Sequence, residues 1–255
     1  VTSRDEIGAL TEDFNAMADS LETKIHQLED ASKRQEDFIA SFAHELKTPL
    51  TSIIGYSDML RSQTLLPEQQ FKAANYIHSE GKRLESLSHK LLELIVYRRE
   101  TYTPSAFEAQ PWLSAIAAVL EPAFRDSGIS LMLSAGPGVI WGEADLLESL
   151  VVNLCDNARK ASPAGSVVSL MGTAEEGGYR ICVRDHGSGI APEELLRVTE
   201  PFYMVDKSRA RAQNGAGLGL ALCAAVAQVH GTALEFTSAL GKGTTVSLLL
   251  KEGGR

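Results

Sequence analysis

Long hydrophobic runs are missing from this 255-residue sequence: no stretch approaches the roughly 20 apolar residues of a membrane-spanning helix, and no signal peptide is visible. Cysteine is scarce. The three present, Cys155, Cys182 and Cys223, form no C-x-x-C pair, so we expect buried free thiols. Basic residues are also in deficit, with 24 Lys and Arg against 33 Asp and Glu. The net charge of -9 argues against a nucleic-acid partner, although it is compatible with phosphate groups held by backbone amides.

The rest of the composition is that of an ordinary globular protein with room for about two domains. Hydrophobic residues make up 44% of the chain and charged residues 22%, so a buried core is expected. The sequence begins abruptly within a helical pattern. We therefore expect it to be a piece of a longer protein.

The N-terminal segment, residues 1–28, has the apolar spacing of a coiled coil. Steps of three and four alternate through Ile7, Leu10, Phe14, Met17 and Leu21. A second consecutive step of four then reaches Ile25, and such a stutter locally unwinds the supercoil. The pattern fits either a plain dimerisation coil or a coil that switches between two packings.

Residues 29–103 are predicted to form a helical hairpin. The first helix should end near Ser62, the segment SQTLLPE should interrupt it, and Pro67 suits the first turn of the second helix. The second helix should end near Arg99, and its apolar stripe consists of Phe71, Ala74, Ile77, Leu84, Leu87, Leu91 and Leu94. Because two amphipathic helices bury little area, the pattern predicts a four-helix bundle built by two chains.

The pattern changes after a linker at residues 100–111. Helices are expected at 111–126, 144–161 and 218–229, and strands at 129–133, 138–141, 166–174, 179–185, 233–239 and 244–250. Helices and mostly antiparallel strands in mixed order predict an α+β two-layer sandwich for residues 104–255. The chain as a whole is thus expected to be multidomain.

Polar groups suited to a polyphosphate lie on the predicted helix 144–161. Asn153, Asn157 and Lys160 are spaced by four and three residues and therefore share one face. An amide oxygen can ligate Mg²⁺, and an ammonium group can neutralise phosphate. Taken alone, the same pattern also describes a solvent-facing helix surface.

Two glycine-containing motifs follow. In DHGSGI, Asp185 is an acceptor at a strand end, and Gly187 and Gly189 let the backbone turn; the motif suits an exocyclic amine or is simply a turn. In NGAGLG, the amides of Gly215, Gly217 and Gly219 open a helix, which favours anions. A charged loop that suits a phosphate-covering lid precedes it and carries Lys207, Arg209 and Arg211.

The order of the motifs is more specific than any one of them. N-x-x-x-N-x-x-K, D-x-G-x-G, EPFY and G-x-G-x-G together resemble the GHKL ATP-binding module of histidine kinases, type II topoisomerases, heat-shock chaperone ATPases and MutL proteins. With FAHELKTPL upstream, essentially the whole chain resembles a sensor histidine kinase of a two-component system. It would combine a HisKA-type dimerisation and phosphotransfer domain (29–103) with a Bergerat-type ATP-binding domain (104–255). SRDEIGALTEDFNAM is similar to the second helix of a HAMP domain within residues 1–28, with Asp5 to Gly8 as its D-E-x-G element.

The resemblance implies a role for each motif toward ATP. Asp185 would bind the adenine amino group, between Gly187 and Gly189 at the base pocket, and Asn157 would hold Mg²⁺. Asn153 and Lys160 would lie beside the phosphates. The lid and the following helix would be anchored and brought close to the triphosphate by Phe202, Tyr203, Gly215, Gly217, Leu218 and Gly219.

Two departures from related proteins matter. Asn153 stands where related ATPases carry a glutamate that activates water, and its presence suits ATP that must wait for a histidine. Met204 stands where many relatives have a basic residue. The γ-phosphate contact would then fall to Lys207, Arg209 or Arg211, among which the sequence does not choose.

FAHELKTP supplies the expected phosphoacceptor. A neutral imidazole nitrogen of His44 can attack phosphorus, and the adjacent Glu45 carboxylate is suited to take the proton from the other nitrogen. Thr48, one helical turn on, resembles the residue that orients water to dephosphorylate a response regulator. Pro49 cannot donate to the carbonyl of Glu45, so a bend below His44 is predicted.

The resemblance further implies a homodimer, a response-regulator partner and a cytoplasmic location in a membrane-anchored protein. Two other functions fit parts of the same pattern. An ATPase or serine kinase is disfavoured by the histidine motif and by Asn153, and a non-enzymatic ATP-binding scaffold is disfavoured by the intact motif set.

Overall fold

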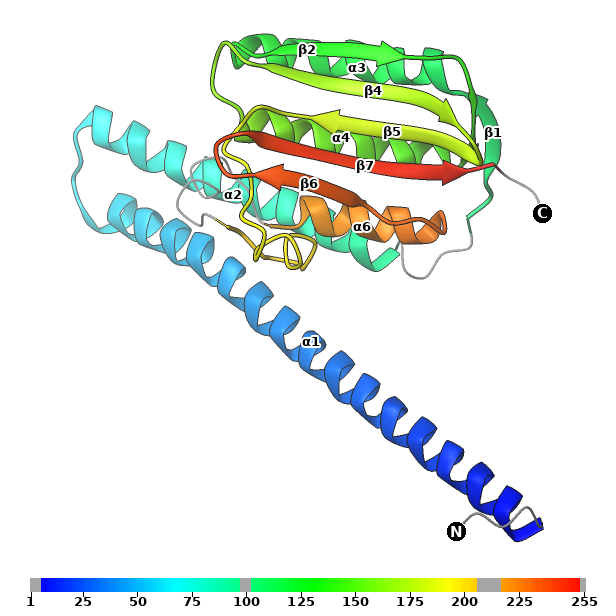
Figure 1. Cartoon of the computed structure of the whole chain (residues 1–255). Helices are drawn as coiled ribbons and strands as arrows, with labels where there is room; N and C mark the ends of the chain where they lie inside the picture. Colours follow the sequence, from blue (N-terminus) through cyan, green and yellow to red (C-terminus); the bar gives the residue numbers. More distant parts are fainter. Residues whose placement is uncertain (1–5, 97–101, 206–216, 253–255) are drawn as a thin grey trace.

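Two long helices and a two-layer α/β unit make up the chain in the computed structural model, which describes residues 6–96, 102–205 and 217–252 (Figure 1). The helices form an antiparallel hairpin, α1 (Glu6–Ser62) and α2 (Pro67–Val96). The predicted break is confirmed, with α1 ending at Ser62 and Pro67 opening α2. The predicted end of the second helix near Arg99 lies outside the described residues. None of the described helices is long and apolar enough to cross a membrane.

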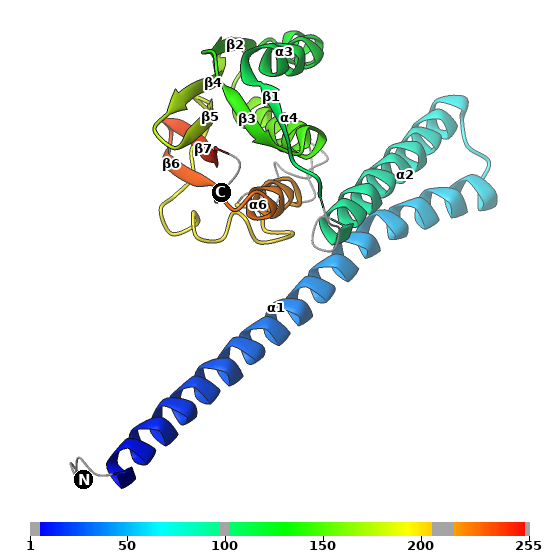
Figure 2. The same cartoon turned by 90° about the vertical axis from the view of Figure 1, so that its right-hand side faces the viewer.

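The first half of α1 extends away from the rest of the molecule in both views (Figures 1 and 2). The large apolar side chains from Leu10 to Leu28 are therefore exposed, with relative exposures between 47% for Ile25 and 71% for Leu28. α1 continues as one helix through Pro49, whose side chain is buried. The bend at this proline stays a prediction.

A five-stranded sheet forms one layer of the second unit. Its spatial order is β2 (Ser130–Ala135), β4 (Val167–Glu175), β5 (Gly178–Arg184), β7 (Gly243–Lys251) and β6 (Glu235–Ala239). The pair β2 and β4 is parallel and the remaining pairs are antiparallel. Side chains along β4 and β7 alternate between buried and partly buried, as expected for a sheet that packs on one face.

Three helices cover that face: α3 (Ala109–Asp126), α4 (Ala144–Ala161) and α6 (Gly219–Val229) (Figures 1 and 2). The predicted α+β two-layer sandwich is confirmed. The core between the layers includes Leu147 and Leu150 of α4, Ile181 of β5 and Val226 of α6. All three cysteines are free, and burial raises the pKa of the Cys155 thiol to about 12.

One strand was missed by the sequence analysis. β1 (Ser105–Glu108) pairs antiparallel with β3 (Val139–Gly142), although residues 100–111 were expected to form a linker. β1 has only four residues, and of these only Phe107 is partly buried. A segment this short shows no alternation that would distinguish it from a linker.

An apolar contact joins the hairpin to the second unit. Leu87 of α2 is buried with Phe202 and Leu218, and Phe38 and Phe42 of α1 pack against the same cluster. The ring centroid of Phe202 lies 5.4 Å from that of Phe38 and 6.1 Å from that of Phe42. We call this group of residues the interdomain cluster. Leu87 belongs to the stripe that was expected to face a partner helix, but it packs here against the α/β unit.

Candidate active site

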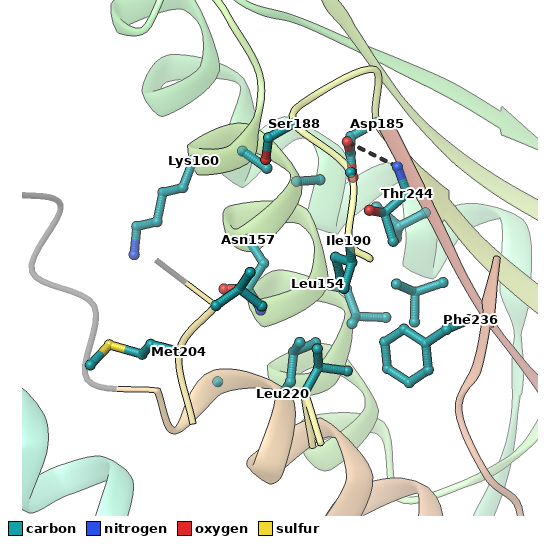
Figure 3. A pocket seen from close by; sticks show the side chains of 18 of the residues that line it. Leu154, Asn157, Lys160, Asp185, Ser188, Ile190, Met204, Leu220, Phe236 and Thr244 are labelled. Carbon is teal, nitrogen blue, oxygen red and sulfur yellow. Dashed lines mark hydrogen bonds between the residues drawn. The ribbon is translucent and has the colours of Figure 1, made fainter. Parts of the chain in front are cut away.

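A pocket of about 410 Å³ opens between α4, the end of β5 and the start of α6 (Figure 3). This volume lies in the range of small-molecule sites, roughly 300–1,000 Å³. Apolar side chains form much of its wall, including Leu154, Val183, Ile190 and Phe236. Asp185, Asn157 and Lys160 add polar groups, an arrangement that suits an aromatic base with a charged extension.

Asp185 supplies a fixed carboxylate at one end of the pocket. It follows β5 and is buried, with 6% relative exposure. Its Oδ1 accepts hydrogen bonds from the backbone amides of Gly187 at 2.8 Å and Thr244 at 3.2 Å, the second of which is drawn in Figure 3. Burial raises the pKa of this carboxyl, and the two amides oppose that rise. The held carboxylate can accept a further hydrogen bond from an amine of a ligand in the pocket.

The turn after Asp185 depends on Gly189. This residue lines the pocket at a φ of 67°, a left-handed conformation that glycine adopts readily. A Cβ at this position would also collide with the carbonyl oxygen of Ala239. Gly187 belongs to the same turn but is not among the lining residues. Of the two glycines predicted to border the base pocket, Gly189 lines the cavity and Gly187 does not.

Helix α4 presents two of its three predicted polar residues to the pocket. Asn157 and Lys160 line it, whereas the Asn153 amide donates to the backbone oxygen of Ser149 at 2.8 Å. The Asn157 side-chain amide nitrogen is buried and has no hydrogen-bond partner among the described residues. Such an orphaned donor fits an acceptor oxygen of a ligand at this place, whereas a cation would be bound by the amide oxygen of Asn157. The described residues include no cluster of three His, Cys, Asp or Glu side chains that could hold a metal, so Asn157 would share a cation with ligand oxygens and water.

The Asp156 carboxylate forms salt bridges with Arg159 and Lys160 at the edge of the pocket. Its carboxylate lies 2.6 Å from Arg159 Nη2 and 2.6 Å from Lys160 Nζ. Burial acts to raise the pKa of Asp156, but the hydrogen bonds from Lys160 and Arg159 hold it below its ordinary value. Lys160 is thus an oriented cation at the pocket edge.

The base of the predicted lid is closed by Phe202 and Gly217. The Phe202 amide donates to the Gly217 carbonyl at 2.8 Å, which joins the two ends of the segment between them. Phe202 has a φ of 66°, a strained value for a non-glycine residue, and a Cβ on Gly217 would lie 2.7 Å from the Phe202 carbonyl carbon. The Tyr203 hydroxyl donates a hydrogen bond to the Glu194 carboxylate, and the Arg197 guanidinium lies over the Tyr203 ring, 4.2 Å from its centroid.

The predicted lid residues are therefore distributed over two environments. Tyr203, Gly217 and Gly219 line the pocket, while Phe202 and Leu218 lie in the interdomain cluster. Lys207, Arg209, Arg211 and Gly215 lie outside the described residues.

Several lining residues were not singled out by the sequence analysis. Most are apolar, among them Leu154, Ala158, Ile190, Val198, Leu220, Leu240 and Val246. In the sequence an apolar residue that lines a pocket is indistinguishable from one that is buried in the core. Lys90 of α2 is a charged lining residue that reaches the pocket from the hairpin, and no local motif marks it.

His44 is exposed on α1 and is not among the residues that line the pocket. Thr48 Oγ1 donates to the His44 backbone oxygen at 3.4 Å. Glu45 was expected to contact His44, but its carboxylate accepts instead from Arg83 Nη2 of α2 at 3.1 Å. Consecutive residues of a helix point in different directions, so Glu45 faces α2 while His44 faces outward. The side chains of Glu45 and Arg83 are each only 9% exposed.

Each part of the chain matches the model of a known protein family. Residues 34–95 match the His Kinase A (phospho-acceptor) domain, and residues 142–254 match the family of histidine kinase-, DNA gyrase B- and HSP90-like ATPases. The histidine protein kinase DivJ of Caulobacter vibrioides is 35% identical over 84% of this chain and 36% of its own length. The sensor protein SrrB of Staphylococcus aureus is 30% identical over 89% of this chain and 39% of its own length. The chain thus spans little more than a third of these relatives.

Solved structures agree with the fold. Full-length ShkA in complex with AMPPNP has a TM-score of 0.60 at 26% identity and covers 86% of this chain and 47% of its own. The histidine kinase ThkA in complex with the response regulator TrrA has a TM-score of 0.71 at 19% identity and covers 90% of this chain and 67% of its own. The second likeness, at this identity, concerns the fold alone.

Proposed function

We propose that the chain is a histidine kinase that transfers the γ-phosphoryl group of ATP to its own His44. The observation that carries the proposal is the pairing of two features. One is a pocket lined by the buried carboxylate of Asp185, and the other is an exposed histidine on the adjoining hairpin. The complex of ShkA with AMPPNP supports an adenine nucleotide as the ligand.

The roles of the residues follow from their positions. Asp185 would accept from the adenine amine, and Asn157 and Lys160 would meet the phosphates on the α4 side. Mg²⁺, when bound through Asn157, would neutralise phosphate charge. An unprotonated nitrogen of His44 would attack the γ-phosphorus, the bond to the ADP oxygen would break, and ADP would leave. Which basic lid residue meets the γ-phosphate stays open among Lys207, Arg209 and Arg211.

Two rearrangements are needed for this reaction. His44 does not line the pocket, so the ATPase domain must leave the interdomain cluster and bring ATP to the histidine. Glu45 must also leave Arg83 before its carboxylate can accept the proton of the His44 ring. Domain motion would therefore gate both the substrate and the base.

We further propose the context that the family resemblance implies. The exposed apolar seam of α1 supports a homodimer, since a second chain would cover it. The phosphoryl group would pass from His44 to an aspartate of a response regulator, and Thr48 would assist the reverse hydrolysis. A HAMP segment at residues 1–28, domain limits at 29–103 and 104–255, and a cytoplasmic position in a membrane-anchored protein complete the proposal.

Incubation with Mg²⁺ and γ-labelled ATP tests it. The label should be stable in alkali, labile in acid, and absent from a His44→Ala variant, because a phosphoramidate hydrolyses in acid. His78, another exposed histidine of the hairpin, provides the matched control, and His78→Ala should label like the parent. Acid-stable label, label that persists without His44, or ATP hydrolysis with no labelled protein would each contradict the proposal.

A further inference from the structure

Lys90 occupies a position in α2 that no family motif marks. It lies three residues after Leu87 and four before Leu94, so the three side chains share one face of the helix. That face packs against the α/β unit. Leu87 contacts the cluster of Phe202 and Leu218, and Leu94 is buried with Ala221 and Leu222 of α6. Lys90 is therefore carried to the edge of the pocket by the same contacts that dock the hairpin.

Lys90 has carboxylates in its neighbourhood but makes no direct contact with one in the part of the chain that the structure describes. It lines the pocket together with Asn157 and Lys160, and it is close enough to Lys160 for their charges to interact. Among the described residues, no hydrogen bond or salt bridge holds its ammonium group. Burial lowers the pKa of Lys90, and the nearby charge of Lys160 lowers it further, while Asp156 and Glu93 oppose the shift. A half-buried ammonium beside another ammonium is stabilised by an anion placed between them.

We infer that Lys90 is a phosphate-binding residue that the helical hairpin contributes to the nucleotide pocket of the ATPase domain. The inference rests on the proposed function for the identity of the ligand. Its consequence is a coupling between two events, because the pocket has its full positive charge only when the hairpin is docked. Nucleotide phosphates would then favour the docked state, and docking would by reciprocity favour nucleotide.

Titration calorimetry of the whole chain tests the inference, with Mg²⁺–AMPPNP and adenosine as the two ligands. A Lys90→Met variant keeps the length and apolar packing of the side chain but removes its charge. It should bind AMPPNP about tenfold or more weakly, since a hydrogen bond to a charged group is lost, and bind adenosine like the parent. A Lys90→Arg variant should restore much of the AMPPNP affinity. Lys72→Met removes an exposed lysine of the same helix that pairs with Glu68 and should change neither affinity.

The outcomes separate the inference from the function. If the parent binds AMPPNP and Lys90→Met binds it equally well, Lys90 has no phosphate-binding role, although the proposed function stands. If Lys90→Met weakens adenosine and AMPPNP by the same factor, the side chain acts only through packing, which also overturns the inference. If the parent binds neither ligand, the proposed function fails and the inference fails with it.

Discussion

Replacement of Phe38 by alanine should increase the rate at which His44 is phosphorylated. Phe38 packs on Phe202 in the interdomain cluster and also against Leu94, Ala221 and Leu222. In this docked arrangement His44 lies outside the nucleotide pocket. If the docked state dominates, the rate at saturating ATP is proportional to the small population of undocked molecules, and the substitution enlarges that population.

The size of the effect follows from the contacts that are lost. Full burial of a phenylalanine side chain contributes about 1.5–3 kcal/mol, and a ring pair adds about 0.5–1.5 kcal/mol. Phe38 is only partly buried, so a loss of about 2 kcal/mol is reasonable, which is roughly a 30-fold change in the docking equilibrium. The initial rate of label incorporation should rise by up to this factor. A Leu196→Ala variant, which removes an apolar side chain that is 88% exposed, should leave the rate unchanged.

A rate for Phe38→Ala that equals or falls below the parental rate would refute the reasoning. It would mean either that the cluster does not restrain the reaction or that Phe38 belongs to the reactive arrangement. The coupling inferred for Lys90 adds a second check. Phe38→Ala should weaken AMPPNP binding, and Lys90→Met should have little further effect in that background, because undocking already removes Lys90 from the pocket.

Three further predictions concern single interactions. Asp185→Asn should weaken AMPPNP binding at least about tenfold by calorimetry, and the parent should lose binding as the pH falls through the raised pKa of Asp185, at a higher pH than for an ordinary aspartate. An unchanged affinity of the variant, or the same loss of binding at low pH in the variant and the parent, would contradict this role. Arg83→Met should lower the free energy of unfolding by about 3–5 kcal/mol in denaturant titrations, because it leaves the Glu45 carboxylate buried without its partner. Adding Glu45→Gln should recover much of the loss, whereas equal stability of Arg83→Met and the parent would show that the Glu45–Arg83 pair is solvated. Thr48→Ala should keep autophosphorylation but lose dephosphorylation of the regulator, and a parental dephosphorylation rate would exclude the role.

The elements that could be predicted from the sequence are those whose ends are marked by nearby residues, such as proline or turn residues. Pro67 marks the start of α2, and the helix predicted at 144–161 coincides with α4, since turn residues and periodic apolar positions bound both. β1 carries no such signal, because its pairing with β3 depends on residues more than 30 positions away in the chain.

The candidate site shows the same division. Asp185, Asn157 and Lys160 were found because a motif fixes their order, and the structure brings them to one pocket. The pairing of Glu45 with Arg83 joins residues 38 positions apart, and the approach of Lys90 to the pocket depends on how two domains dock. Contacts of this kind arise from tertiary packing, on which the local pattern of one sequence carries little information.

The most direct test of the central claim is to locate the phosphoryl group. The chain would be incubated with Mg²⁺ and ATP, digested under alkaline conditions that preserve phosphohistidine, and analysed by tandem mass spectrometry. The account predicts phosphohistidine at His44 in the parent and at least about tenfold slower formation of it in Asp185→Asn at limiting ATP. Phosphate on a serine, threonine or another histidine, with His44 unmodified, would contradict it.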